Sequence, residues 1–141
     1  RRKEMSILIE ELKKEHSEIL AALNEVKQLG ILSEEGQDKL MSLEVSLLAH
    51  LEMEDDQLYP ALKKEAEHSN SIKDTLELFA IDMENVSKTV REFFEKYSEG
   101  FSGVELDKLS EDFEIFFSAL TKRICNEEES LYEEYETLDR S

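Results

Sequence analysis

Apolar side chains recur at intervals of three and four residues through four long segments of the chain. This spacing is typical of α-helices that bury one face. Polar breaks rich in glycine and serine separate the segments and predict helices over residues 5–29, 34–67, 71–98 and 103–138. Because the connections are short, consecutive helices are expected to run antiparallel. We therefore predict an all-α fold, an up-down-up-down antiparallel four-helix bundle that forms one domain over residues 1–141.

Serine residues in the breaks predict where helices begin. Ser33 is followed by two glutamates and is expected to cap the second helix. Ser71 and Ser102 each precede an acidic residue by three positions, which is the spacing of a capping box. Pro60 falls inside the second helix, where it removes one backbone hydrogen bond, and is expected to kink or end that helix.

Five polar residues lie on the apolar faces of these helices rather than on the charged outer faces. They are His16, His50, Glu54, Arg123 and Glu127. A lone buried charge costs several kcal/mol, so such residues are tolerated only where they meet partners. Because they come from three different helices, we expect them to converge on one polar site inside the bundle.

The chain also repeats weakly. Residues 50–62 (HLEMEDDQLYPAL) match residues 123–135 (RICNEEESLYEEY): in both, a basic or imidazole residue precedes a glutamate by four positions, and a Leu-Tyr pair follows. The repeat predicts two related helical hairpins with an internal pseudo-twofold axis. The tyrosines of the two copies are expected to pack in the bundle with their hydroxyl groups turned to a partner.

The converging residues include the donor set of a transition-metal site. His50 and Glu54 are four positions apart, so their side chains share a helix face and lie about 6 Å apart along its axis. His16 adds a second imidazole, and Glu127 adds a second carboxylate. This donor set suits Fe(II), Mn(II) or Zn(II) better than Ca²⁺ or Mg²⁺, which prefer oxygen ligands alone.

The run EH…HxxxEDxxLYP, followed by its altered second copy, resembles the hemerythrin family in its HHE cation-binding form, over nearly the whole chain. The resemblance implies a four-helix bundle around a non-haem di-iron centre, with a role in oxygen binding, iron or oxygen sensing, or metal storage. It matches His16 to the histidine of the first helix, and His50 and Glu54 to the histidine and bridging carboxylate of the second. Glu127 matches the bridging carboxylate of the fourth helix.

Two positions depart from the family's pattern. Met83 and Arg123 stand where the third and fourth helices would each supply a histidine, and both losses fall on the same metal of the pair. A guanidinium group stays protonated and cannot bind a metal. We expect Arg123 to pair with Glu127 and, across the bundle, with Glu54, roughly in place of the second cation. The expected cofactor is therefore one divalent ion, iron first and zinc or manganese as alternatives, and reversible two-iron oxygen binding should be lost.

Three functions remain open. The first is a metal-binding module with a mononuclear site in metal, oxygen or redox sensing. The second is a metal-free scaffold or protein-interaction module, because one protonated histidine would complete a neutral network of Arg, Glu and His without an ion. The third is an oxidase or peroxidase that uses one iron. Motifs for nucleotide binding and nucleophilic hydrolysis are absent, so we do not expect an enzyme.

The net charge of the chain limits the kinds of molecule that it can bind. It has 17 Lys and Arg against 35 Asp and Glu, a net charge of −18, which opposes binding to nucleic acids and anionic membranes. No apolar run is long enough for a membrane span. One cysteine excludes an internal disulfide framework and fits a reducing compartment. We expect a soluble cytoplasmic protein in which residues 1–4 are an extension ahead of a start at Met5.

Overall fold

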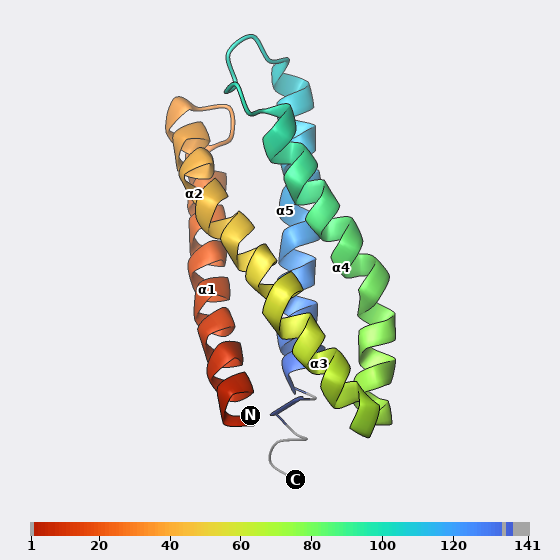
Figure 1. Cartoon of the computed structure of the whole chain (residues 1–141). Helices are drawn as coiled ribbons and strands as arrows, with labels where there is room; N and C mark the ends of the chain where they lie inside the picture. The colour runs from red at the N-terminus through yellow and green to blue at the C-terminus, as the bar shows by residue number, and fades with distance from the viewer. Residues whose placement is uncertain (1, 134, 137–141) are drawn as a thin grey trace.

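The computed structural model describes residues 2–133, 135 and 136, and all its regular elements in that range are helical. They are α1 (Arg2–Leu29), α2 (Glu34–Met53), η1 (Glu54–Leu58), α3 (Tyr59–Glu65), η2 (Ala66–His68), α4 (Asn70–Lys96), α5 (Leu106–Asn126) and η3 (Glu127–Leu131). Because α2 to η2 follow one another directly, and η3 continues α5, the chain forms the four antiparallel arms of the predicted bundle (Figure 1). Among the described helices, none has the length and apolar character needed to cross a membrane. The predicted helix over 103–138 includes residues 134, 137 and 138, which lie outside the described residues.

Two π-helical turns occur at matching places in the two halves of the chain. In η1 the N–H of Tyr59 bonds to the carbonyl of Glu54, and in η3 the N–H of Tyr132 bonds to the carbonyl of Glu127. Such turns insert one extra residue into a helix and are frequent at functional sites. Proline is not their cause, because only η1 is followed by one. Pro60 does not end the helix: it directly follows the π turn η1, and α3 continues through it.

The structure confirms one of the three predicted serine caps. Ser33 caps α2, with its hydroxyl 3.0 Å from a first-turn amide. The prediction for Ser71 is wrong, because Ser69 has the extended backbone (φ −149°, ψ 112°) that turns its hydroxyl onto the first turn of α4. The prediction for Ser102 is also wrong: it lies in the loop before α5, which starts without a side-chain cap.

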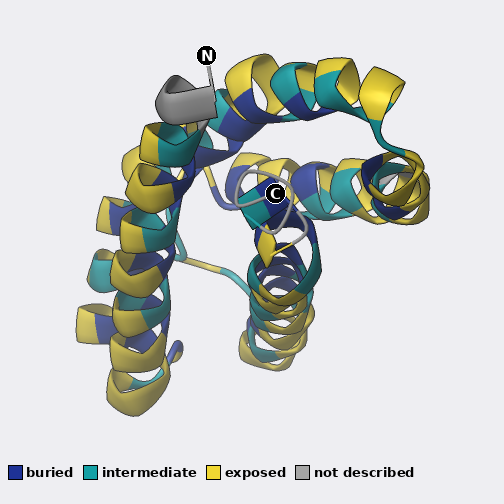
Figure 2. Ribbon diagram, turned by 90° about the horizontal axis from the view of Figure 1, so that it is seen from below, coloured by how far each residue is buried: buried dark blue, intermediate teal, exposed yellow. Residues whose placement is uncertain are grey.

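The buried residues lie on the inward faces of the arms (Figure 2), and the apolar ones among them form two clusters. The larger one includes Ile19, and the smaller one includes Leu12. His16 lies between these residues on α1. The other four polar residues predicted to face inward also lie between the two clusters along their own arms. We call these five the polar layer: His16, His50, Glu54, Arg123 and Glu127. Apolar packing on both sides keeps bulk water away from this layer.

Helix α4 packs less closely around the polar layer than its neighbours do. Its apolar stripe is only half-buried at Phe79, Met83 and Val86, whereas Val90 and Phe93 are buried near the α4–α5 loop. The looser part of α4 is the part that faces Arg123, since Arg123 bonds to the carbonyl of Met83.

Side-chain hydrogen bonds of Asp112 link α5 to the C-terminal end of α4, several helical turns away from the polar layer. Its carboxylate accepts hydrogen bonds from the Tyr97 hydroxyl and the Lys96 ammonium, both at 2.6 Å, and Lys108 lies 3.5 Å away. Burial raises the pKa of this carboxyl, but the bond from Lys96 and the neighbouring charges outweigh burial, so that the pKa of Asp112 is lowered from its usual 3.8.

We expect Asp112→Asn to lower the free energy of unfolding by about 1 kcal/mol at pH 7, because it removes charge-assisted hydrogen bonds. Since the pKa of Asp112 is lower in the folded chain, its contribution is present above the unfolded pKa and is lost as pH falls through the folded one. The difference between wild type and variant in urea unfolding should therefore shrink from about pH 5 to pH 3. A difference that stays constant over this range, or an equal effect of Glu111→Gln at an exposed neighbouring position, would contradict this account.

Candidate metal centre

The structure brings together the five polar residues singled out in the sequence. His16 comes from α1, His50 from α2 and Arg123 from α5, while Glu54 and Glu127 are the first residues of the two π turns. Each of the five is at most 4% exposed. Because Glu54 follows His50 by four residues and Glu127 follows Arg123 by four, each acid shares the inward face of its arm with that residue.

The inner nitrogens of the histidines face the two carboxylates. His16 Nε2 lies 3.3 Å from Glu127 Oε1 and 3.7 Å from Glu54 Oε2, and His50 Nε2 lies 3.3 Å from Glu54 Oε1. One ligand atom from each of His16, His50 and Glu54 lies within 4.8 Å of the others. Ligands that share an ion at about 2.0–2.2 Å lie about 3–4 Å apart, so small side-chain rotations would let these three bind one ion.

Three of these inward atoms have no hydrogen-bond partner among the described residues. They are His16 Nε2, His50 Nε2 and Glu127 Oε1. Buried polar atoms are nearly always paired, so a group of unpaired ones facing one place calls for an explanation. Two nitrogen donors and carboxylate oxygens are the donor set of a transition-metal ion, and the residues present therefore fit one such ion.

The outer nitrogens are held by carboxylates from other elements. His16 Nδ1 lies 2.7 Å from Glu128, and His50 Nδ1 lies 2.6 Å from Glu15. An ionised carboxylate only accepts, so each Nδ1 carries the proton, and in the neutral ring Nε2 keeps its lone pair inward. Metal-binding histidines are commonly oriented in this way. The sequence analysis missed Glu15 and Glu128, although each adjoins a predicted site residue.

Arg123 pairs with both glutamates, as the sequence predicted. Its NH2 lies 3.2 Å from Glu54 Oε1, and its Nε lies 3.5 Å from Glu127 Oε2. NH1 donates to the carbonyl of Met83 at 3.0 Å and to the hydroxyl of Ser87 at 2.8 Å. Ser87 is a partner that the sequence analysis missed. The guanidinium thus occupies the α4–α5 side of the polar layer, and the residues there do not fit a second metal ion.

Two tyrosines join the halves of the layer crosswise. The hydroxyl of Tyr59 donates to Glu127, and the hydroxyl of Tyr132 donates to Glu54 at 3.0 Å. Each tyrosine therefore follows one π turn and binds the glutamate that begins the other, so the two repeats exchange equivalent hydrogen bonds. Burial and the charges of the two glutamates raise the pKa of both tyrosines above the usual range, so both remain neutral donors.

The layer attracts positive charge. Burial lowers the pKa of His16, but the carboxylates of Glu127 and Glu54 outweigh burial and raise it to about 10. Burial also opposes the charge of Glu54, yet the nearby imidazoles of His16 and His50 lower its pKa well below the usual value. Burial and the charge of Glu54 raise the pKa of Glu127 to about 7. A metal ion at this place would compete with protons on the histidines.

A comparison with protein families agrees with this geometry. The family model of the hemerythrin HHE cation binding domain matches residues 7–135. The matched range holds all five residues of the polar layer and both π turns. No curated protein and no solved structure matches the chain. Because the family match runs from residue 7 to residue 135, it covers nearly the whole bundle rather than one local motif.

We expect Arg123→Met to lower the free energy of unfolding by about 3–5 kcal/mol in the presence of EDTA, because it leaves two buried carboxylates without their permanent cation. Urea unfolding followed by circular dichroism measures this loss. Arg91→Met is the matched control, because Arg91 forms an exposed ion pair with Asp55 at 3.5 Å. This control should change stability by less than about 1 kcal/mol. Equal effects of the two substitutions would show that the glutamates relax without Arg123.

Proposed function

Because the chain belongs to the hemerythrin HHE cation-binding family, we propose that it binds one divalent metal ion in the polar layer. The ligands in this proposal are His16, His50, Glu54 and Glu127. One observation carries it: two buried imidazoles turn Nε2 atoms without a hydrogen-bond partner toward Glu54, and that of His16 also faces Glu127. Iron is the first choice of metal, with zinc and manganese as alternatives that suit the same nitrogen and oxygen donors.

The proposed centre is mononuclear. Arg123 already pairs with one oxygen of each glutamate, and Met83 offers its backbone carbonyl to that guanidinium. The chain has three histidines, and the third, His68, is exposed in η2. No imidazole is therefore left for a second ion. This supports the expectation that two-iron oxygen binding is lost.

The chain's own residues prepare the layer for the ion. Glu15 and Glu128 orient the imidazoles, the two tyrosines hold the carboxylates, and apolar clusters on both sides keep water away. A bound iron or manganese ion would supply redox chemistry, and zinc would supply charge alone. We propose a role in metal or redox sensing, because an ion that bridges α1, α2 and η3 would couple metal supply to the stability of the bundle.

A metal-free scaffold is the second candidate. The observation that favours it is the charge balance: one protonated histidine, His16, together with Arg123 neutralises both glutamates without an ion. The two candidates differ in what metal does to the folded chain. A sensor is stabilised by its ion, whereas a scaffold is indifferent to it.

We expect chain purified without chelator and loaded with Fe(II), Zn(II) or Mn(II) to hold about one ion, because the layer has one set of ligands. His50→Ala should reduce this to below about 0.2 ion per chain by elemental analysis, since it removes one ligand of four. His68→Ala is the matched control and should bind as wild type does. Wild-type chain that holds fewer than about 0.2 ion after loading with all three metals would contradict the metal proposal.

We also expect metal to raise the melting temperature. At a free ion concentration of 100 times the Kd, binding adds about 2.7 kcal/mol to the free energy of unfolding. Differential scanning calorimetry with and without EDTA should show a shift of several degrees for wild type and His68→Ala, and none for His50→Ala. An identical melting temperature in EDTA and in each metal would favour the scaffold.

A further inference from the structure

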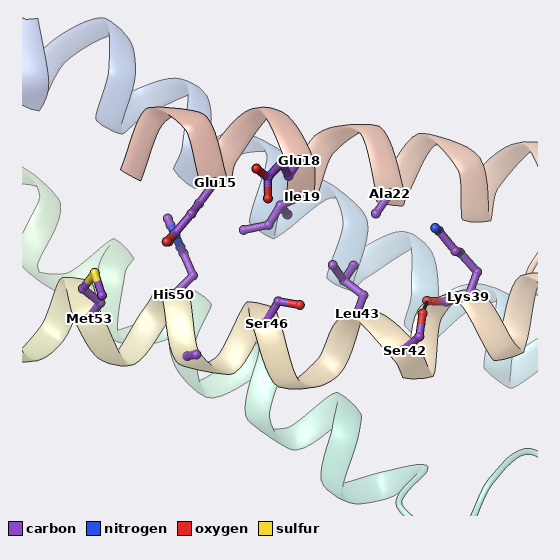
Figure 3. A pocket seen from close by; sticks show the side chains of 11 residues that line it. Glu15, Glu18, Ile19, Ala22, Lys39, Ser42, Leu43, Ser46, His50 and Met53 are labelled. Carbon is purple, nitrogen blue, oxygen red and sulfur yellow. Dashed lines mark hydrogen bonds and ion pairs between the residues drawn. The ribbon is translucent and has the colours of Figure 1, made fainter. Parts of the chain in front are cut away.

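Two grooves of the described structure are lined by residues of the polar layer, and a third is lined by a partner of Arg123. One, of 430 Å³, lies between α1 and α2 and is lined by His50 (Figure 3). The other two lie on either side of Met83 in α4. A groove of 340 Å³ between α4 and α5 is lined by Arg123, and a groove of 850 Å³ on the other side of α4 is lined by Ser87, which bonds to Arg123.

The α1–α2 groove carries negative charge where it meets His50. Glu15 and Glu18 line it from α1, and Figure 3 shows the carboxylate of Glu15 against the His50 ring with Glu18 beside it. Lys39, the one basic residue of its lining, is seen at the far end and pairs with Glu25 at 3.2 Å. His50 itself is 3% exposed, and its unpartnered Nε2 faces the layer. A cation in this groove would meet the carboxylates of Glu18 and Glu15 and then His50, a proposed metal ligand.

The grooves beside α4 carry charges of both signs. Arg123 lines the smaller one beside Glu127, with which it pairs, and Lys122 and Asp82 line it as well. The larger one is lined by no residue of the polar layer, and its charged residues are three basic and four acidic: Lys63, Lys88, Arg91, Asp55, Glu84, Glu92 and Glu95. A divalent ion in the smaller groove would meet two fixed cations beside the ligand Glu127, at a repulsion that low dielectric strengthens.

We propose that the divalent ion enters the polar layer through the α1–α2 groove, where Glu15 and Glu18 attract it toward His50. This inference rests on the proposed function, because it concerns the route to the same ligands. Glu15 binds Nδ1 of His50 at 2.6 Å, so an ion that neutralises Glu15 weakens the bond that holds the ring. A bound ion would be held by Nε2 of the same ring, on the inner side of the groove wall.

Stopped-flow uptake of Zn(II) from a chromophoric chelator tests the route. Glu18→Lys should lower the association rate constant about three- to tenfold at low salt, because it reverses a charge beside the path of a divalent ion. The difference should shrink as ionic strength rises. The number of ions bound at equilibrium should not change. Glu84→Lys, at an exposed glutamate of the larger α4 groove, is the matched control and should load at the wild-type rate.

A second pair of variants tests the same route without a change of charge. Ser46 and Ser118 are exposed serines that line the α1–α2 and the α4–α5 groove. Ser46→Phe should slow uptake by obstructing the groove, and Ser118→Phe should not. Uptake at the wild-type rate in both Glu18→Lys and Ser46→Phe, or slower uptake in the α4 variants, overturns the route alone. Wild-type chain that takes up no ion at all overturns the proposed function, and the route with it.

Discussion

The carboxylates of Glu54 and Glu127 are buried at the centre of the bundle, and their charge has to be matched there. Taking an ion out of water costs several kcal/mol even after the protein has relaxed around it. Each neighbour of these acids reduces that cost: Arg123 by direct pairing, two tyrosines by donated hydrogen bonds, and two histidines by offering protons or a bound cation. The polar layer is therefore best understood as the set of partners that two inward-facing acids require.

The bundle meets this requirement with one structural device used twice. A π turn follows each glutamate, and the tyrosine at the end of that turn binds the glutamate of the other half. The two halves differ in their basic positions, where His16 and His50 correspond to Met83 and Arg123. One half thus supplies two imidazoles to the polar layer, while the other half supplies a guanidinium.

Much of this arrangement follows from the chain's pattern of apolar positions. Polar residues on an apolar stripe are costly, so their presence at His16, His50 and Arg123 was a strong signal of convergence. The supporting carboxylates of Glu15 and Glu128 carried no such signal, because acidic residues are common on every outer face of a chain with 35 of them. The π turns and the cap at Ser69 were missed because they depend on which carbonyl each amide selects. Periodicity does not encode that choice.

The covalent attachment of Arg123 fixes one positive charge beside the two buried acids. A guanidinium cannot be extracted by a chelator, diluted away or replaced by a competing ion, and it keeps its proton over the whole range of pH in which proteins are folded. Part of the charge on the acids is therefore matched in every solution that the chain meets, whatever solutes that solution contains.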